Sequence, residues 1–110
     1  MPYINVSTSG KIEDKKKFLE EISILVSSLT KKSKRFVMAK LDHNFEMYFE
    51  DDSPCCFLEI KSIGSLSPSE MAKPISNFVS EKMGIPPDKI YISFQDVPGS
   101  MWAWNGRTFG

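Results

Sequence analysis

The order of the predicted elements constrains the fold of this chain more than any other feature. Alternating apolar and polar residues predict strands over 3–8, 36–41, 55–63 and 90–95. Apolar residues spaced three, four and seven apart predict amphipathic helices over 13–29 and 67–83. The order strand, helix, strand therefore occurs twice. Because such crossovers are right-handed, we predict an α/β (α+β) fold in which a four-stranded mixed sheet carries both helices on one face.

The boundaries of the second helix and of one loop can also be predicted. Ser67 and Glu70 have the spacing of a capping box, and Pro68 suits the first helical position. Gly84 suits the residue that ends the helix. Residues 45–49 are expected to form a short strand, in a hairpin with the strand that precedes them.

The whole chain, 1–110, is predicted to be a single domain with two similar halves, roughly 2–54 and 55–110. Gly10 and Asp42 of the first half correspond to Gly64 and Asp96 of the second. These identities are sparse. The repeated strand–helix–strand order supports the two halves more strongly than the identities do.

The charge balance excludes several classes of partner. Lys plus Arg and Asp plus Glu number 14 each, so no net field steers the protein toward nucleic acid or a membrane. No apolar run approaches the ~18 residues of a spanning helix, and the start of the chain lacks a signal-peptide pattern. We expect a cytoplasmic protein, and an extracellular role would require secretion without a leader.

The two cysteines, Cys55 and Cys56, are adjacent in the sequence. Neighbouring residues of a strand point to opposite faces, so this pair is expected neither to form a disulfide nor to share a metal. We predict two free thiols, one facing inward and one facing outward. The sequence offers no spacing typical of a metal site, and no metal or cofactor is expected.

One face of the predicted sheet would have no helix to cover it. The residues expected to face the helices are Ile4, Val6, Val37, Ala39, Leu41, Leu58, Ile60, Ile90, Ile92 and Phe94. The residues expected on the other face are Tyr3, Asn5, Phe36, Met38, Phe57, Lys61, Tyr91 and Ser93. That second face is half apolar, and an exposed patch of this kind usually binds a partner. We predict that further copies of the same chain cover it in closed symmetry.

Pro2 is the residue with the most distinctive chemistry. If Met1 is removed, Pro2 presents a secondary amine, and α-amino groups have an ordinary pKa of about 7.7–8.0. Burial or a nearby cation such as Lys32 would lower that pKa and yield a general base at neutral pH. Two simpler interpretations remain open: many chains begin with Met-Pro for no chemical reason, and Lys32 could be one solvated residue of a basic run.

Several motifs together resemble the macrophage migration inhibitory factor family, which includes D-dopachrome tautomerase and belongs to the tautomerase superfamily. These motifs are the opening Met-Pro-x-Ile-x-Val, the Ser-Ile-Gly turn at 62–64, Pro-Asp-Lys-Ile-Tyr-Ile at 87–92 and Trp-Asn-Gly-Arg-Thr-Phe at 104–109. The resemblance covers the whole chain. It implies a homotrimer whose three sheets line a central barrel, and keto–enol tautomerisation of phenylpyruvate- or dopachrome-type substrates.

The resemblance also implies roles for individual residues. Pro2 would be the catalytic base, Lys32 would bind the carboxylate of a small enolisable substrate, and Ile63 would offer its backbone N–H. Tyr91 would reach the site from the adjacent subunit. The remaining residues expected to line the pocket are Tyr3, Phe36, Lys61, Trp102, Trp104 and Phe109.

Three positions depart from the animal members of that family. Ser93 replaces a site asparagine, so its shorter side chain alters the expected contact with substrate. Cys55 with Cys56 replaces a Cys-x-x-Cys motif, which removes the basis for a thiol–disulfide oxidoreductase role. Trp102 replaces a small apolar residue at the rim of the pocket and is expected to narrow the entrance.

Two functions therefore compete on the sequence, and a third is disfavoured. The first is a tautomerase that uses Pro2 and no cofactor. The second is a cytokine-like signalling protein with a vestigial pocket and a receptor as its partner. A nucleic-acid-binding module would have to use the basic run 31–35, but the zero net charge and the lack of an aromatic RNA-binding motif argue against it.

Overall fold

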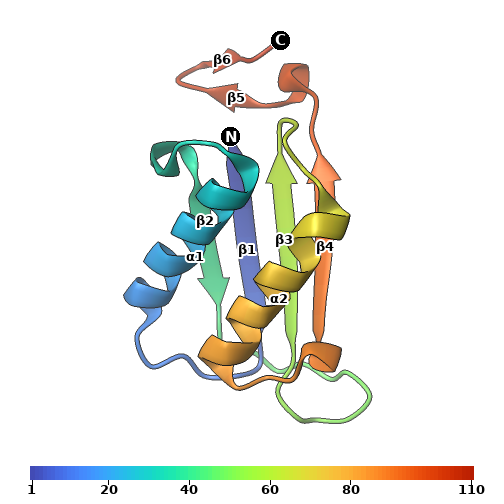
Figure 1. The fold of residues 1–110 in the computed structure, drawn as a ribbon. Coiled ribbons are helices and arrows are strands. Elements are labelled where there is room, and N and C mark those ends of the chain that lie inside the picture. Colours follow the sequence, from blue (N-terminus) through green and yellow to red (C-terminus); the bar gives the residue numbers. More distant parts are fainter.

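The computed structural model describes all residues, 1–110, as one main sheet, two helices and a C-terminal hairpin (Figure 1). The principal elements are β1 (Pro2–Thr8), α1 (Lys15–Thr30), β2 (Met38–Asp42), β3 (Cys56–Ser62), α2 (Pro68–Met83), β4 (Ile90–Asp96), β5 (Ala103–Trp104) and β6 (Arg107–Thr108). The four predicted main strands and both predicted helices are present.

The main sheet has the strand order β2-β1-β3-β4. β1 runs parallel to β2 and β3 runs parallel to β4, whereas the central pair, β1 and β3, is antiparallel. Each parallel pair is joined by one helix, and both helices cover the same face (Figure 1). The prediction of a four-stranded mixed sheet with two helices on one face is confirmed.

The core lies between this face and the helices. The central strands contribute Ile4, Val6, Leu58 and Ile60, which are at most 1% exposed. α1 contributes Phe18, Ile22 and Val26, and α2 contributes Met71, Ile75 and Val79. Burying each aliphatic side chain of this size contributes roughly 1.5–3 kcal/mol. The predicted apolar face of the sheet is therefore the face that the helices cover.

The ends of the two helices show which capping residues hold them. Asp14 caps α1, because its side chain accepts a hydrogen bond from the backbone N–H of Lys17 at 3.0 Å. Gly84 ends α2 with a φ of 68°, in the left-handed region that favours glycine, as predicted. The capping-box prediction was wrong in one respect, because the side chain of Ser67 makes no capping hydrogen bond at the start of α2. Pro68 does occupy the first turn.

Three further predictions were wrong. Residues 45–49 form no strand, and only an isolated bridge joins Phe49 to Asp51. Phe36 lies in a 3₁₀ turn, Lys34–Phe36, before β2 begins. Cys55 and Cys56 are both buried as free thiols, because Cys55 precedes β3 and packs beside Ser9 instead of following the strand's alternation.

The open face of the sheet exposes large apolar side chains. Met38 is 67% exposed, Phe57 is 38% exposed and Tyr91 is 57% exposed. Asn5 also points to this face, yet it is buried, and its Nδ2 donates to Glu59 Oε2 at 3.5 Å. The predicted division of the strands into a covered and an uncovered face holds, apart from Phe36.

Lys89 holds the long loop between β2 and β3. Its ammonium donates to the carbonyl of Phe49 at 2.7 Å and to Asp51 Oδ1 at 3.1 Å. Hydrogen bonds from Ser53 and then from Lys89 lower the pKa of Asp51 to about 2. Burial alone would lower the pKa of Lys89, but Asp51 and Glu50 outweigh it and raise that pKa.

The C-terminal hairpin β5–β6 lies beyond the end of the main sheet, next to the N-terminus (Figure 1). Its two-residue turn is Asn105-Gly106, with φ values of 53° and 80°. Positive φ at both positions is the geometry of a type I′ turn, which Asn-Gly favours. Neither helix of the structure has the length and apolar character needed to cross a membrane.

Candidate active site

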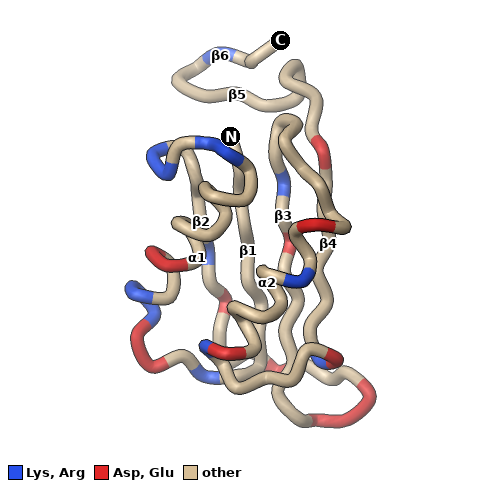
Figure 2. The backbone as a smooth tube through the Cα atoms, in the orientation of Figure 1, with Lys and Arg blue, Asp and Glu red and all other residues tan.

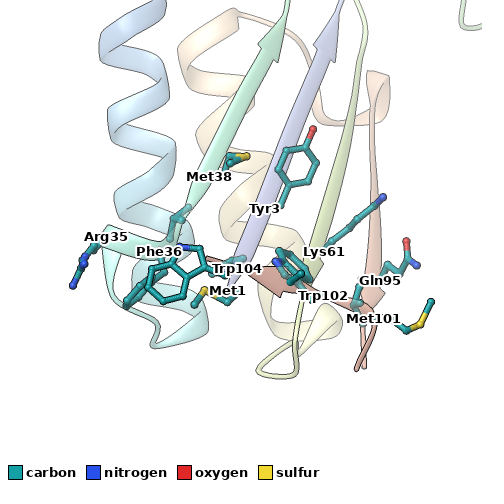
Figure 3. A pocket seen from close by; sticks show the side chains of 14 residues that line it. Met1, Tyr3, Arg35, Phe36, Met38, Lys61, Gln95, Met101, Trp102 and Trp104 are labelled. Atoms are coloured by element: carbon teal, nitrogen blue, oxygen red, sulfur yellow. The ribbon is translucent and has the colours of Figure 1, made fainter. Parts of the chain in front are cut away.

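A pocket of about 800 Å³ opens between the end of the main sheet and the C-terminal hairpin (Figure 3). It falls in the usual size range of small-molecule sites, about 300–1,000 Å³. Ten of its 14 lining residues are hydrophobic. The lining comprises Met1, Pro2, Tyr3, Arg35, Phe36, Val37, Met38, Lys61, Gln95, Val97, Met101, Trp102, Ala103 and Trp104.

Pro2 is the first residue of β1 and is fully buried. It pairs in register with Ser62, the last residue of β3, so the start of one central strand meets the end of the other. Pro2 also lines the pocket, at the end of the sheet where the chain begins. The amino terminus lies at this same end of the sheet, in the wall of the pocket.

The electrostatics of this end favour a neutral amine. Desolvation, and then the positive charge of Lys32, lower the pKa of the amino terminus, which Met1 carries in this structure. Both effects act in the direction expected, since each disfavours the charged form of an amine. Lys32 directly follows the left-handed residue that ends α1, and its carbonyl accepts a hydrogen bond from Ser27 Oγ at 2.6 Å.

Positive charge gathers around the pocket. Figure 2 shows Lys and Arg concentrated in the turn after α1, beside the N-terminus. Arg35 and Lys61 are the two charged side chains in the lining, and no acidic residue lines it. The pocket therefore combines apolar walls with a positive rim, which suits a small anionic ligand.

Aromatic side chains form the wall on the hairpin side. The rings of Phe36 and Trp104 meet edge to face, with centroids 5.9 Å apart and planes at 88°. Trp102 also lines the pocket, apart from this pair and on the side where Lys61 lies (Figure 3). The backbone N–H of Phe109 donates to the carbonyls of Gly99 and Trp102, at 3.0 and 3.1 Å, and so folds the tail onto itself. The hairpin thus brings Trp104 against the turn that carries Phe36.

The structure brings together six of the predicted site residues in this pocket. They are Pro2, Tyr3, Phe36, Lys61, Trp102 and Trp104. The other five lie outside its lining. Among these, Lys32 acts on the amino terminus through its charge, and Ile63 directly follows the partner of Pro2. Phe109 directly follows β6, the second strand of the hairpin.

Tyr91 and Ser93 lie farther along the sheet. Tyr91 pairs with Phe57, which in turn pairs with Ser7, so about five residues of strand, or about 17 Å, separate its level from that of Pro2. Its ring packs on Phe49, with centroids 4.6 Å apart. Ser93 pairs with Glu59, midway along the same face. One chain alone does not bring Tyr91 to Pro2.

Sequence reasoning missed several lining residues. Gln95 could have been found, because it follows Tyr91 and Ser93 at a spacing of two and lies beside Lys61 in register. Arg35 was treated only as part of a basic run, and a 3₁₀ turn places it at the rim. Met38 was assigned to the open face but not to the pocket. The others carry no signal in the sequence: Met1, Val37, Val97, Met101 and Ala103.

The chain is similar to known proteins over its whole length. The model of the family "Macrophage migration inhibitory factor (MIF)" matches residues 1–110. A macrophage migration inhibitory factor homologue from Trichinella spiralis is 29% identical over 114 residues, covering 99% of this chain and 100% of the relative. The homologue from Wuchereria bancrofti is 30% identical over 118 residues, covering 100% of both.

The fold is also similar to that of solved structures. The crystal structure of a macrophage migration inhibitory factor homologue from Prochlorococcus marinus aligns with a TM-score of 0.93 at 36% identity, covering 98% of this chain and 99% of that one.

Proposed function

The chain belongs to the macrophage migration inhibitory factor family, and we propose that it is a keto–enol tautomerase whose general base is the amine of Pro2 after removal of Met1. The substrates are small enolisable carboxylates of the phenylpyruvate or dopachrome type, and the reaction is an isomerisation. The observation that supports this most directly is the lowered pKa of the amino terminus at a pocket with apolar walls and a positive rim.

The chemistry follows from the amine. With Met1 removed, the amine of Pro2 would occupy the same partly desolvated end of β1, near Lys32. A lowered pKa leaves more of the amine neutral at pH 7 and so available as a base. The amine takes a proton from the carbon next to the ketone, and the C–H electron pair forms the C=C bond. The C=O π pair moves to the oxygen, which takes a proton from the ammonium and so restores the amine. The reverse sequence converts an enol to its ketone.

Binding residues are assigned by the same proposal. Lys32 holds the substrate carboxylate, and the backbone N–H of Ile63 lies next to the strand position that faces Pro2. Phe36, Trp102 and Trp104 hold the apolar part of the substrate. The reaction moves protons only, so no cofactor or metal takes part in the proposed steps, and the structure contains no group of three or more potential metal ligands.

A homotrimer would complete this site. The uncovered face exposes Met38, Phe57 and Tyr91, and burying them against other copies is favourable. Asn5 Oδ1 on the same face is buried without a hydrogen-bond partner in the chain, and a neighbouring copy could supply one. Because Tyr91 lies far from Pro2 in its own chain, it would reach a site only from an adjacent subunit.

Replacing Pro2 tests the function. Pro2→Ala should lower kcat/KM for phenylpyruvate tautomerisation by orders of magnitude, with a residual rate because a primary amine is still basic. The fraction of wild-type protein that retains Met1, identified by intact mass, should be nearly inactive, since its Pro2 nitrogen is an amide. Turnover like that of the wild type in either protein would contradict the proposed base.

A second function is favoured by the relatives, which are named for macrophage migration inhibition. In that case the chain would be a cytokine-like protein that acts through a receptor. It would reside in the cytoplasm and be released from there to meet that receptor. The pH–rate profile separates the two functions, because an enzyme should show an ionisation near neutrality that disappears when Pro2 is blocked. Absence of any turnover would favour the binding role.

A further inference from the structure

The cations of the pocket are not neutralised within the chain. Neither Arg35 nor Lys61 takes part in a salt bridge, whereas Lys40, Lys82 and Lys89 each pair with a carboxylate. No acidic residue lines the pocket to compensate them. Unpaired positive charge beside low-dielectric walls raises the local concentration of anions.

Lys61 is the better placed of the two cations. It lies on β3, paired in register with Tyr3 of β1 on one side and with Gln95 of β4 on the other. It is half-buried, and its side chain extends on the same side of the pocket as Gln95 (Figure 3). Arg35 is exposed, stacks over the ring of Phe36 at 5.2 Å and points away from the other lining residues (Figure 3).

Three hydrogen-bonding side chains therefore stand in one row across the end of the sheet: the phenol of Tyr3, the ammonium of Lys61 and the amide of Gln95. All three can donate to an anionic oxygen. Tyr3, the partner of Lys61, is the residue next to Pro2, which puts the Cα atoms of Lys61 and Pro2 roughly 6 Å apart from the usual strand spacings. A small ligand can reach from the amino terminus to this row.

We propose that Lys61, with Tyr3 and Gln95, forms a second anion subsite, so that the preferred ligands are enolisable oxo acids carrying a second acidic group. The enolisable part rests on the proposed function. Lys32 would bind the carboxylate next to the ketone, and Lys61 would bind the other acidic group. The proposed subsite concerns ligand binding alone, so it does not depend on turnover.

Two matched pairs of compounds test the subsite. For turnover, the pair is phenylpyruvate and 4-carboxyphenylpyruvate, compared by kcat/KM at low ionic strength. For binding alone, the pair is phenylacetate and 4-(carboxymethyl)benzoate, compared by quenching of the fluorescence of Trp102 and Trp104. In each pair the wild-type protein should prefer the diacid by about tenfold, as expected for one charge-assisted hydrogen bond in a partly solvated site.

Variants then assign that preference to one side chain. Lys61→Gln should reduce the preference for the diacid to about twofold or less, while Lys61→Arg should retain most of it. Lys40→Gln is the matched control: Lys40 is on the same face of the sheet but does not line the pocket, so its loss should leave the preference unchanged. Added salt should weaken the wild-type preference without any mutation.

The outcomes separate the two proposals. If neither oxo acid is turned over but 4-(carboxymethyl)benzoate still binds about tenfold better than phenylacetate, the tautomerase proposal fails and the subsite stands. If the wild-type protein shows no preference for either diacid, or if Lys61→Gln keeps the preference in full, the subsite is wrong. If Lys61→Gln fails to fold, two other measurements test the subsite. A preference for the diacid that Lys61→Arg retains and that added salt weakens in the wild-type protein supports it, and a preference that does not respond to salt contradicts it.

Discussion

Removing the ring of Trp104 should release the C-terminal hairpin. Trp104 is 51% exposed, so about half of its side chain is buried, and its main aromatic contact is the edge of Phe36. A fully buried aromatic side chain removes ~200 Å² from water, so half of one, at ~25 cal/mol per Å², contributes about 2.5 kcal/mol. The edge-to-face contact adds roughly 0.5–1.5 kcal/mol. Trp104→Ala should therefore lower the free energy of opening the hairpin by about 3 kcal/mol.

Hydrogen exchange measures this effect locally. The reporters are the backbone amides of Phe109 and Trp102, which both donate to the carbonyl of Gly99. A loss of about 3 kcal/mol should speed their exchange by about 100-fold, while amides of the central strands should change little. Trp104→Phe keeps an aromatic edge and should lose much less protection. If the tail amides of Trp104→Ala exchange within twofold of the wild-type rate, the hairpin is held by other contacts and the reasoning is refuted.

Three further predictions concern the core, the thiols and the loop. Ile60→Ala should lower the free energy of unfolding by about 2–5 kcal/mol in denaturant titration. Phe57→Ala, on the uncovered face, should mainly weaken the oligomer and so reduce the mass measured by sedimentation. Equal effects of the two substitutions on the free energy of unfolding would contradict the assignment of faces. Burial, and then the neighbouring thiol of Cys55, raise the pKa of Cys56 to about 12. Alkylation of Cys56 at pH 8 should therefore be slow until the protein unfolds. The free energy of unfolding should fall as the pH rises from about 9 toward 12, because the Cys56 thiol ionises over that range only in the unfolded chain. Lys89→Met should lower the thermal midpoint and speed amide exchange in the loop before β3. Because the pKa of Asp51 is lowered to about 2, the stability that its carboxylate contributes should be complete above about pH 4 and be lost as the pH falls from about 4 toward 2. A thermal midpoint that does not change with pH over that interval would exclude this contribution of Asp51.

The sheet and helices could be predicted because their signals are local and repeated. The alternation that separates Ile4 from Asn5, and Ile60 from Lys61, follows directly from the geometry of a strand. The signal that ends α2 is equally local, because Gly84 itself adopts the left-handed conformation there. These features required no knowledge of what packs against them.

The failures occur where tertiary contacts decide the local structure. The side chain of Ser33 accepts from the N–H of Arg35 at 3.3 Å and starts a 3₁₀ turn that removes Phe36 from β2. Hydrogen bonds from Lys89, some 40 residues along the chain, shape the loop that was expected to be a strand. Cys55 is buried because it packs against Ser9.

The pocket was only half predictable for the same reason. Strand alternation indicates Tyr3 and Lys61, and the tail aromatics stand out in the sequence. The approach of the hairpin to Phe36 joins segments about 70 residues apart and has no local signal. Tyr91 lies about five residues of strand from the level of Pro2 in its own chain, so only the proposed neighbouring subunit would bring it to the site.

The proposed reaction depends on the amine of Pro2, whose pKa must be lowered for it to act as the base near neutral pH. The most direct test is the titration of the ¹⁵N chemical shift of Pro2 in protein whose intact mass shows that Met1 is absent, together with the pH dependence of kcat/KM for phenylpyruvate. We expect a midpoint below the ordinary α-amino range of about 7.7–8.0, a rate that rises with pH through that same midpoint, and a higher midpoint in Lys32→Gln. A Pro2 amine that titrates at or above the ordinary range, with the rate rising at a different pH, would contradict the proposed base.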